Sequence, residues 1–355
     1  MIDLTLLKQM ITEGYVHVQK HPTLDLFIYN YAPTAQYERV WNDVTLMCRG
    51  LILDANYNIV ARPFTKFFNL GESENQVLPN EPFEVYEKMD GSLGIMYFVD
   101  SQAFIATRGS FSSNQAIRAN AILNEKYAQI VQNTVEERNP DSFGKGPLDK
   151  TKTYLFEIIY PENRIVVDYG ATEDLILTAI VDNATGEDMP LIDVGFPLVK
   201  QYHGIHDIHL LKTLEEANRE GFIIKYKSGL RYKVKFEEYL RIHRIVTQVS
   251  NINIWEYMSA GMPFDEMLDR VPDEFYDWVK KTSADLKMQF AVIENQCKLD
   301  FKILATRKES ALYFQTCAYP AVLYKMLDKK PYNDVIWKML RPDFQKPFSK
   351  NYEIT

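Results

Sequence analysis

The chain has 355 residues, of which 46% are hydrophobic and 25% charged, and its formal net charge is −8. This composition is ordinary for a folded protein, and the length allows one to three domains with a sizeable core. The negative charge argues against a protein that coats nucleic acid without sequence preference, but it leaves room for an enzyme with a local basic site.

Membrane and secretion signals are missing from the sequence. We find no run of about 18 apolar residues, as a membrane-spanning helix would need, and no basic region followed by an apolar stretch at the N-terminus. Three widely spaced cysteines, Cys48, Cys297 and Cys317, argue against a disulfide framework or a zinc site. We therefore expect a cytoplasmic protein with no membrane partner.

The first 240 residues mix helical and strand patterns. Apolar residues recur at helical spacing in 4–11, 114–138 and 212–219. Short runs of β-branched and aromatic residues, bounded by turn residues, predict strands. These runs are 25–31, 50–54, 58–62, 83–86, 95–98, 154–160, 164–169, 175–182, 222–226 and 232–236.

The composition changes near residue 237. From there to the end the sequence has one glycine, Gly261, and amphipathic spacing recurs in 275–288, 290–304 and 310–327. The sequence therefore predicts two domains, a mixed α and β domain at 1–240 and an all-helical domain at 241–355.

The most informative segment is 87–93, Glu-Lys-Met-Asp-Gly-Ser-Leu. A lysine at the end of a predicted strand, followed two residues later by Asp-Gly, suits covalent nucleotidyl transfer. Lys88 would be the nucleophile, and Gly91 would let the backbone approach a nucleotide closely. Taken alone, such a match is explained better by a plain β-turn.

Other segments place charges near predicted strands. Arg49 lies just before a strand, and Lys66 lies among aromatic residues. Glu157 lies inside an apolar strand, and Glu220 begins another. Each of these alone also fits a solvated or paired side chain.

Lys233 and Lys235 are two residues apart in a strand, so their side chains share one face. In this order around Lys88, the segments resemble the motifs of the covalent nucleotidyltransferase superfamily, which contains polynucleotide ligases and mRNA capping enzymes. In that reading Lys88 is motif I, Glu157 motif III, Glu220 motif IV and 233–235 motif V.

Two features favour one branch of this superfamily. A helical segment follows motif V, where DNA ligases and capping enzymes usually carry a β-rich domain. Four segments are also similar to the phage RNA ligase 1 family, the tRNA-repair ligases of T-even phages. These segments are 29–32 (YNYA), 48–50 (CRG), 66–70 (KFFNL) and 161–166 (PENRIV).

The resemblance implies an α+β nucleotidyltransferase domain, ATP-grasp-like, with antiparallel sheets around an ATP site. It implies an ATP-dependent RNA ligase that joins RNA 5′-phosphate and 3′-OH ends through lysyl-AMP and RNA-adenylate, with Mg²⁺ replaceable by Mn²⁺. The implied partners are RNA, extending to cleaved tRNA, and an end-healing polynucleotide kinase/phosphatase. A phage-encoded enzyme would act in the cytoplasm of the host cell.

The resemblance also assigns roles to residues. The catalytic set is Lys88, Glu157, Glu220, Lys233 and Lys235. The ATP-binding set is Tyr29, Arg49, Lys66, Phe68, Lys88, Gly91, Arg108, Glu157, Lys233, Lys235 and Tyr239. Metal contacts are expected at Glu220 and Asp265. Arg108 stands where the family pattern has lysine, so a point donor becomes a planar fork.

The chemistry adds a charge requirement. Lys88 must be neutral to attack, so we expect Glu157 and Glu220 to hold metal or ribose rather than to pair with Lys88. Two alternatives remain open from the sequence. One is a DNA ligase or capping-type nucleotidyltransferase, and the other is an RNA-binding protein with a decayed ligase fold.

Overall fold

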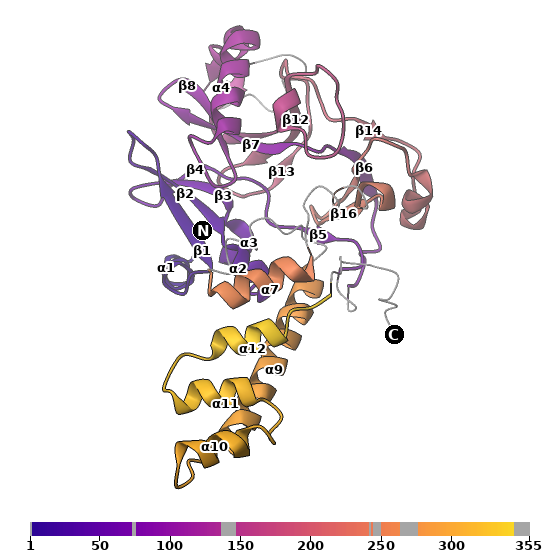
Figure 1. Cartoon of the computed structure of the whole chain (residues 1–355). Helices are drawn as coiled ribbons and strands as arrows, with labels where there is room; N and C mark the ends of the chain where they lie inside the picture. Colours follow the sequence, from indigo (N-terminus) through magenta and orange to yellow (C-terminus); the bar gives the residue numbers. More distant parts are fainter. Residues whose placement is uncertain are drawn as a thin grey trace. The chain divides into compact units, whose positions relative to one another are not determined.

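The computed structural model describes residues 2–72, 76–135, 147–240, 243, 250–262 and 276–343. The chain divides into two compact units, Met1–Val246 and Thr247–Thr355, shown in Figure 1. The first unit mixes helices with largely antiparallel sheets, and the described part of the second is helical. The predicted α+β fold class with a helical C-terminal region is confirmed, while the predicted boundary after residue 240 stays a prediction.

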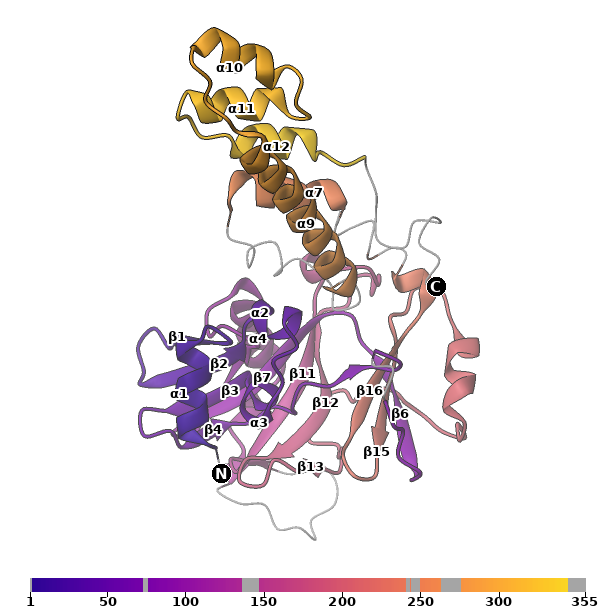
Figure 2. The same ribbon diagram turned by 90° about the horizontal axis from the view of Figure 1, so that it is seen from below.

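Three larger sheets lie in the described part of the first unit (Figures 1 and 2). The N-terminal sheet has the order β1 (Val16–Lys20), β2 (Leu26–Tyr31), β3 (Arg49–Asp54), β4 (Ile59–Ala61). The β11 sheet has the order β13 (Asp188–Met189), β12 (Asp174–Asp182), β11 (Lys152–Ile159), β7 (Ser92–Val99), β8 (Gln102–Thr107). The β15 sheet has the order β14 (Gln201–Tyr202), β6 (Phe83–Lys88), β15 (Gly221–Tyr226), β16 (Arg231–Lys235), β5 (Phe68–Asn69).

All strand pairs in these sheets are antiparallel except β16 with β5. A separate parallel pair joins β9 (Thr134–Val135) to β10 (Leu148–Asp149). The helices whose bounds are described in this unit are α1 (Leu4–Thr12), α2 (Pro33–Tyr37), α3 (Asp43–Met47), α4 (Asn114–Lys126) and α5 (Ala128–Val131), with 3₁₀ turns η1 (Pro161–Asn163) and η2 (Ile208–Leu214).

Polar caps begin the longer helices. The Asp3 carboxylate accepts from two backbone N–H groups of α1, and the Ser113 hydroxyl accepts from one of α4. Asn42 and Thr45 form a reciprocal capping box at α3. These side chains satisfy N–H groups that have no partner inside the helix, which explains where each helix starts.

The β11 sheet buries both of its faces. Alternate residues of β11 point to opposite sides, so Phe156 packs with Ile122 and Leu123 of α4, while Leu155 packs with Ile52 of the N-terminal sheet. Burying both faces stabilises the sheet through the hydrophobic effect. The β11 sheet is therefore held in place by packing on both faces.

Two predicted elements of this unit are wrong. Residues 164–169 form an irregular segment and not a strand, because the Val166 and Val167 N–H groups donate to the Asp90 carboxylate and not to a neighbouring strand. The helix predicted at 212–219 is replaced by η2, which ends at Leu214.

The helical unit has its own core. Its helices are α7 (Asn251–Ala260), α9 (Tyr276–Asp300), α10 (Arg307–Phe314), α11 (Pro320–Leu327) and α12 (Asn333–Met339). Phe314, Val322, Leu323 and Ile336 are buried at its centre. The predicted single helix at 310–327 is two helices, because a proline at 320 cannot continue a helix but fits its first turn.

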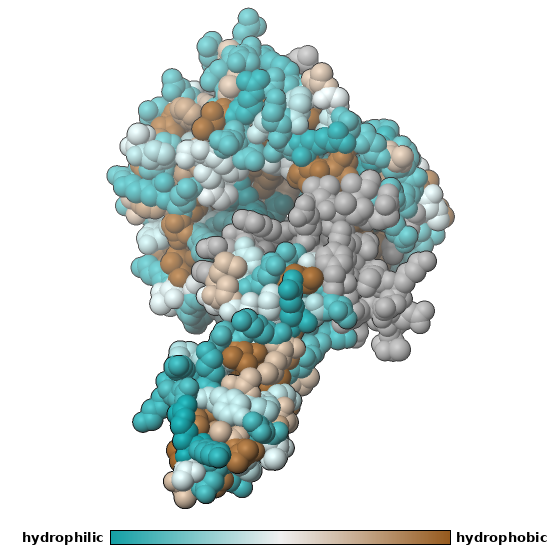
Figure 3. Space-filling view, in the orientation of Figure 1, coloured by the Kyte–Doolittle hydropathy of each residue, from teal (hydrophilic) through white to brown (hydrophobic). Residues whose placement is uncertain are grey.

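The hydropathy of the surface and of the described helices is that expected from the ordinary composition of the chain. On the face drawn in Figure 3, hydrophilic residues predominate and hydrophobic ones occur in small groups. Among the described residues, none of the helices has the length and apolar character needed to cross a membrane.

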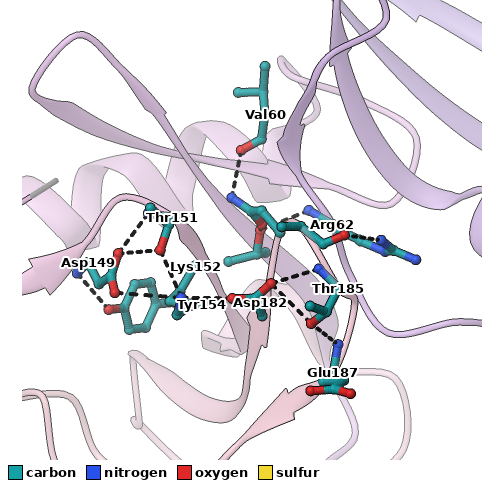
Figure 4. Close-up of polar contacts among 12 residues, drawn as sticks. Val60, Arg62, Asp149, Thr151, Lys152, Tyr154, Asp182, Thr185 and Glu187 are labelled. Carbon is teal, nitrogen blue, oxygen red and sulfur yellow. Dashed lines mark hydrogen bonds and ion pairs between the residues drawn. The ribbon is translucent and has the colours of Figure 1, made fainter. Parts of the chain in front are cut away.

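A polar network joins the N-terminal end of β11 to the C-terminal end of β12 (Figure 4). Lys152 Nζ lies 2.7 Å from Asp182 Oδ2, and the Thr185 N–H donates to Asp182 Oδ1 at 2.7 Å. Burial works against the Asp182 carboxylate, but the hydrogen bonds from Lys152 and Thr185 outweigh it and lower the pKa of Asp182 to about 2. The ionised form of Asp182 therefore stabilises the fold.

We expect Asp182→Asn to lower the free energy of unfolding by about 1 kcal/mol near neutral pH. Because the pKa of Asp182 is lowered from its ordinary 3.8 to about 2, its stabilisation is present above about pH 4 and is lost as the pH falls towards 2. Urea unfolding between pH 2 and 7 should thus show a weaker acid dependence in the variant. Asp25→Asn, at a surface ion pair with Lys20, is the control and should change little.

Candidate active site

A cavity of about 490 Å³ lies in the first unit, where residues of the β11 and β15 sheets and of the segment between β4 and β5 come together. Among its described lining residues, seven are basic and two, Glu87 and Glu157, are acidic. A chain of net charge −8 thus concentrates positive charge at one cavity, which suits a polyanionic ligand. The basic residues are Arg49, Lys88, Arg108, Lys225, Arg231, Lys233 and Lys235.

Lys88 is the last residue of β6 and pairs directly with a buried carboxylate. Its Nζ donates to Glu220 Oε2 at 2.6 Å, and Lys235 Nζ lies 3.3 Å from Glu220 Oε1. Glu220 is only 3% exposed, and a buried carboxylate needs such partners. The expectation that both glutamates stay clear of Lys88 is therefore wrong for Glu220.

Strand pairing explains this triad. Gly221 of β15 lies opposite Lys88 of β6 on one side and Lys235 of β16 on the other. Glu220 is the residue immediately before this point, so its side chain reaches both lysines. The predicted motifs I, IV and V thus meet at the same end of three adjacent strands.

A glycine is required at position 221, where β15 is paired with β6 on one side and β16 on the other. Its φ is +149°, and a Cβ there would lie 1.9 Å from the Val234 carbonyl oxygen, which is backbone and cannot swing away. We expect Gly221→Ala to lower the free energy of unfolding by about 3 kcal/mol or more. The matched control is Gly229→Ala in the same hairpin, which has φ +86° but no heavy atom within 4 Å of the added Cβ. Urea denaturation should show a cost of about 1–2 kcal/mol there, and equal costs for the two variants would contradict the argument.

Glu157 faces the cavity from β11. Its Oε1 accepts the Gly91 N–H at 2.9 Å, so it touches the turn that follows Lys88. Burial raises the pKa of Glu157 to about 7, and the nearby Glu220 charge adds to this, while Lys88 opposes it. A cation beside Glu157 would therefore be favourable.

The turn after Lys88 is held by Asp90, which is 3% exposed. Asp90 Oδ2 accepts the N–H groups of Val166 and Val167, each at 2.8 Å, and Oδ1 accepts the Tyr239 hydroxyl at 2.8 Å. Tyr239 was predicted to bind ATP, but in the structure it is a buried partner of Asp90 and does not line the cavity.

Two phenylalanine rings line the cavity next to its basic residues. The Arg49 guanidinium lies 5.0 Å from the centre of the Phe64 ring and 5.7 Å from that of Phe67. The Arg231 guanidinium lies 5.1 Å from the same Phe64 ring, and Lys233 Nζ 5.8 Å from that of Phe67. These contacts hold the cationic side chains at the cavity wall.

Lys66 and Phe68 lie behind this wall. Lys66 is 5% exposed, and its Nζ donates to Gln36 Oε1 at 3.0 Å and lies 5.4–5.7 Å from the ring centres of Tyr31, Trp41 and Phe68. The predicted phosphate and nucleoside contacts of Lys66 and Phe68 stay predictions, since the cavity is lined by Phe64 and Phe67 instead.

Tyr29 is a predicted ATP contact that does not line the cavity, and its role stays a prediction. It is 4% exposed and packs in the core of the N-terminal sheet with Leu51 and Leu53, and burial raises the pKa of Tyr29 to about 12. Tyr31, two residues further along β2, contacts the cavity-lining Arg108 instead. Its hydroxyl accepts from Arg108 Nη1 at 3.1 Å.

The family described as RNA ligase matches residues 47–240, more than half of the chain. The chain belongs to this RNA ligase family. The family predicted from the Lys88 motif is confirmed, and the matched residues contain Lys88, Glu157, Glu220, Lys233 and Lys235.

Three similar proteins show how far the likeness extends. A protein from Thermovibrio ammonificans, assigned as an RNA ligase, is 32% identical over 55% of this chain and 52% of its own length. A baculovirus protein of Autographa californica nuclear polyhedrosis virus, assigned as a bifunctional polynucleotide kinase/RNA ligase, is 28% identical over 69% of this chain and 37% of its own. The RNA ligase of Rhodothermus phage RM378 is 23% identical over 78% of this chain and 76% of its own. The chain thus spans about half of the first relative and about a third of the second.

Solved structures are more distant. A Naegleria gruberi RNA ligase with ATP and Mn has a TM-score of 0.34 and 18% identity, covering 46% of this chain and 52% of its own. An archaeal ATP-dependent RNA ligase has a TM-score of 0.43 and 14% identity, covering 92% of this chain and 77% of its own.

Few carboxylates of the described site are available to hold a metal ion. Among the described residues, no cluster of three or more His, Cys, Asp or Glu side chains is placed to hold an ion. Both Glu220 oxygens face lysines, and Asp265 lies outside the described residues. The metal roles of Glu220 and Asp265 stay predictions.

Several residues that the structure brings to the site were assigned no role in the sequence analysis. Phe64, Phe67 and Arg231 line the cavity, and Asp90 anchors the turn after Lys88. A signal existed for each: the two phenylalanines flank Lys66 in a segment already singled out, Asp90 lies inside the Lys88 motif, and Arg231 continues the face of Lys233 and Lys235 two residues earlier.

Proposed function

We propose that this chain is an ATP-dependent RNA ligase that joins RNA 5′-phosphate and 3′-OH ends through lysyl-AMP and RNA-adenylate. The observation that carries the proposal is the convergence of Lys88, Glu157, Glu220 and Lys235 at one basic cavity, in a chain of the RNA ligase family. A triphosphate suits the excess of basic side chains, and the neighbouring lysine supplies a nucleophile.

In the first step Lys88 Nζ attacks the α-phosphorus of ATP, a P–N bond forms, and the P–O bond to pyrophosphate breaks. The Lys88 ammonium must first lose a proton, and Glu220 Oε2, at 2.6 Å, is in place to accept it. Lys235 and Lys233 extend from the same strand and stabilise the negative charge that gathers on the phosphate. Arg49 and Arg108 line the cavity as donors for the departing pyrophosphate.

Mg²⁺ fits this site only with help from the nucleotide. Magnesium is commonly held by one or two carboxylates together with substrate phosphates. Glu157, whose pKa burial raises to about 7, is the cavity carboxylate that gains most from an adjacent cation. Bound there, the metal would supply charge stabilisation at the phosphates.

In the second step the RNA 5′-phosphate attacks the lysyl-AMP phosphorus, and the P–N bond to Lys88 breaks. In the third step an RNA 3′-OH attacks the activated 5′-phosphate, a phosphodiester forms and AMP leaves. Lys88 thus acts in the first two steps and not in the third.

We extend the proposal to repair of broken RNA, including cleaved tRNA, together with an end-healing enzyme. One relative is named for kinase and ligase functions in one polypeptide. Since a ligase of this chemistry needs a 5′-phosphate and a 3′-OH, a polynucleotide kinase/phosphatase would prepare its substrates.

The test is circularisation of a 5′-³²P-labelled single-stranded RNA with ATP and Mg²⁺, beside a DNA of the same sequence. Circles from RNA and few from DNA are expected. Circles from DNA alone, or covalent labelling by GTP but not ATP, would favour the DNA ligase or capping alternative. A chain that binds RNA but takes up no nucleotide would be the non-catalytic alternative.

A further inference from the structure

The segment 161–169 contains a motif, PENRIV, that the mechanism above does not use. It leaves β11 through η1 and runs to Tyr169 without joining a sheet. Instead, its polar groups contact residues 90–92, the turn that carries the chain from Lys88 at the end of β6 into β7. Two sheets meet at this turn, because β6 belongs to the β15 sheet and β7 to the β11 sheet.

Asn163 joins this turn to β11. Its Nδ2 donates to Ser92 Oγ at 3.1 Å and to the Ile158 carbonyl oxygen at 3.1 Å, and its Oδ1 lies 3.2 Å from Ser92 Oγ. One side chain therefore links the first residue of β7 to the end of the strand that carries Glu157.

Tyr169 contacts Asp90 in the same turn. The Asp90 N–H donates to the Tyr169 hydroxyl at 2.8 Å. Together with the Val166 and Val167 N–H groups on the Asp90 carboxylate, the segment fixes both the backbone and the side chain of Asp90. A buried carboxylate bonded in this way has one stable position.

We propose that Asn163 and Tyr169 are positioning residues, which fix the 90–92 turn so that Lys88 of one sheet stays in register with Glu157 of the other. This inference rests on the proposed function and deepens it. The pairing of β6 with β15 fixes Lys88 on its N-terminal side, and the turn fixes it on the other. A loosened turn would let Lys88 drift from the line of attack, and a displacement of about 1 Å can cost about 100-fold in rate.

The test compares two asparagines whose side chains make similar numbers of hydrogen bonds. Asn163→Ala removes the contacts to Ser92 and Ile158. Asn120→Ala removes three comparable bonds, to the N–H and carbonyl of Ile105 and to the Ala116 carbonyl, in a part of the same unit that does not touch the turn. Both variants should melt at similarly lowered temperatures.

Two reactions are measured in each variant. Asn163→Ala should slow lysyl-AMP formation by about 10- to 100-fold at saturating ATP, with the KM for ATP within about threefold of wild type. Sealing of pre-adenylylated RNA, which does not use Lys88, should stay within about threefold. Asn120→Ala should retain both reactions.

A purely structural role for Asn163 predicts a different result, in which both reactions fall in proportion or Asn163→Ala matches Asn120→Ala. Either outcome would overturn the inference. Ser92→Ala should reproduce the defect, and the double variant should be no worse than the poorer single one. If Asn163→Ala does not fold, Tyr169→Phe, which removes one acceptor atom, carries the same test. The wild-type protein is measured first. If it forms no lysyl-AMP, the proposed function itself is refuted, and this result is distinct from any difference between the variants.

Discussion

Lys88→Ala should form no detectable lysyl-AMP, a loss of at least about 10⁴-fold, because the substitution removes the nucleophile and not merely a binding contact. The fold should persist, since Lys235 still pairs with the buried Glu220 when the Lys88 side chain is removed. The measurement is covalent labelling of the chain by [α-³²P]ATP and Mg²⁺. Sealing of pre-adenylylated RNA should survive in the variant, because the third step does not need Lys88.

The control is Lys20→Ala, at an exposed lysine of β1 that also has an acidic partner and an aromatic neighbour. It should label like wild type. Undiminished labelling of Lys88→Ala would show that another group takes the AMP, and Lys225, Lys233 and Lys235 of the same cavity would become the candidates.

Glu220→Gln should slow lysyl-AMP formation by about 100-fold or more and lower the free energy of unfolding by about 3 kcal/mol. The glutamine keeps the shape but removes the charge that Lys88 and Lys235 share at 2.6 and 3.3 Å. It also removes the proton acceptor next to Lys88. Single-turnover labelling and urea unfolding measure the two effects.

This variant also tests the electrostatics of Glu157. Burial and the Glu220 charge raise the pKa of Glu157 to about 7, so its carboxylate is ionised only above that pH and wild-type labelling should fall as the pH drops through about 7. In Glu220→Gln the pKa of Glu157 should be lower, and the acid limb of the residual labelling should shift to lower pH. The control is Glu216→Gln, at an exposed ion pair with Arg219, and should show neither effect. An unshifted acid limb would contradict the coupling.

Lys88, Glu220 and Lys235 could be grouped from the sequence because their segments resemble motifs I, IV and V. The structure brings these three residues to one end of three adjacent strands. The ion pair of Lys88 with Glu220 could not be predicted, since it depends on which strand lies between the other two.

Other features of the structure depend on local geometry that no spacing rule reveals. Tyr29 and Tyr31 are both buried, and Tyr31 is the one that contacts the cavity-lining Arg108. Phe67 and Phe68 are adjacent, but only Phe67 lines the cavity, because neighbouring residues of an extended chain point to opposite sides. Residues 164–169 have strand composition, yet the Asp90 carboxylate takes the N–H groups that a strand would need.

The central claim is that Lys88 carries the AMP. The direct measurement is peptide mapping by mass spectrometry of the chain after incubation with ATP and Mg²⁺ and removal of free nucleotide. We expect one AMP, in an acid-labile phosphoamide, on the peptide that contains Lys88, and its loss on addition of 5′-phosphorylated RNA. An AMP on any other residue, or an adduct that RNA does not discharge, would contradict this account.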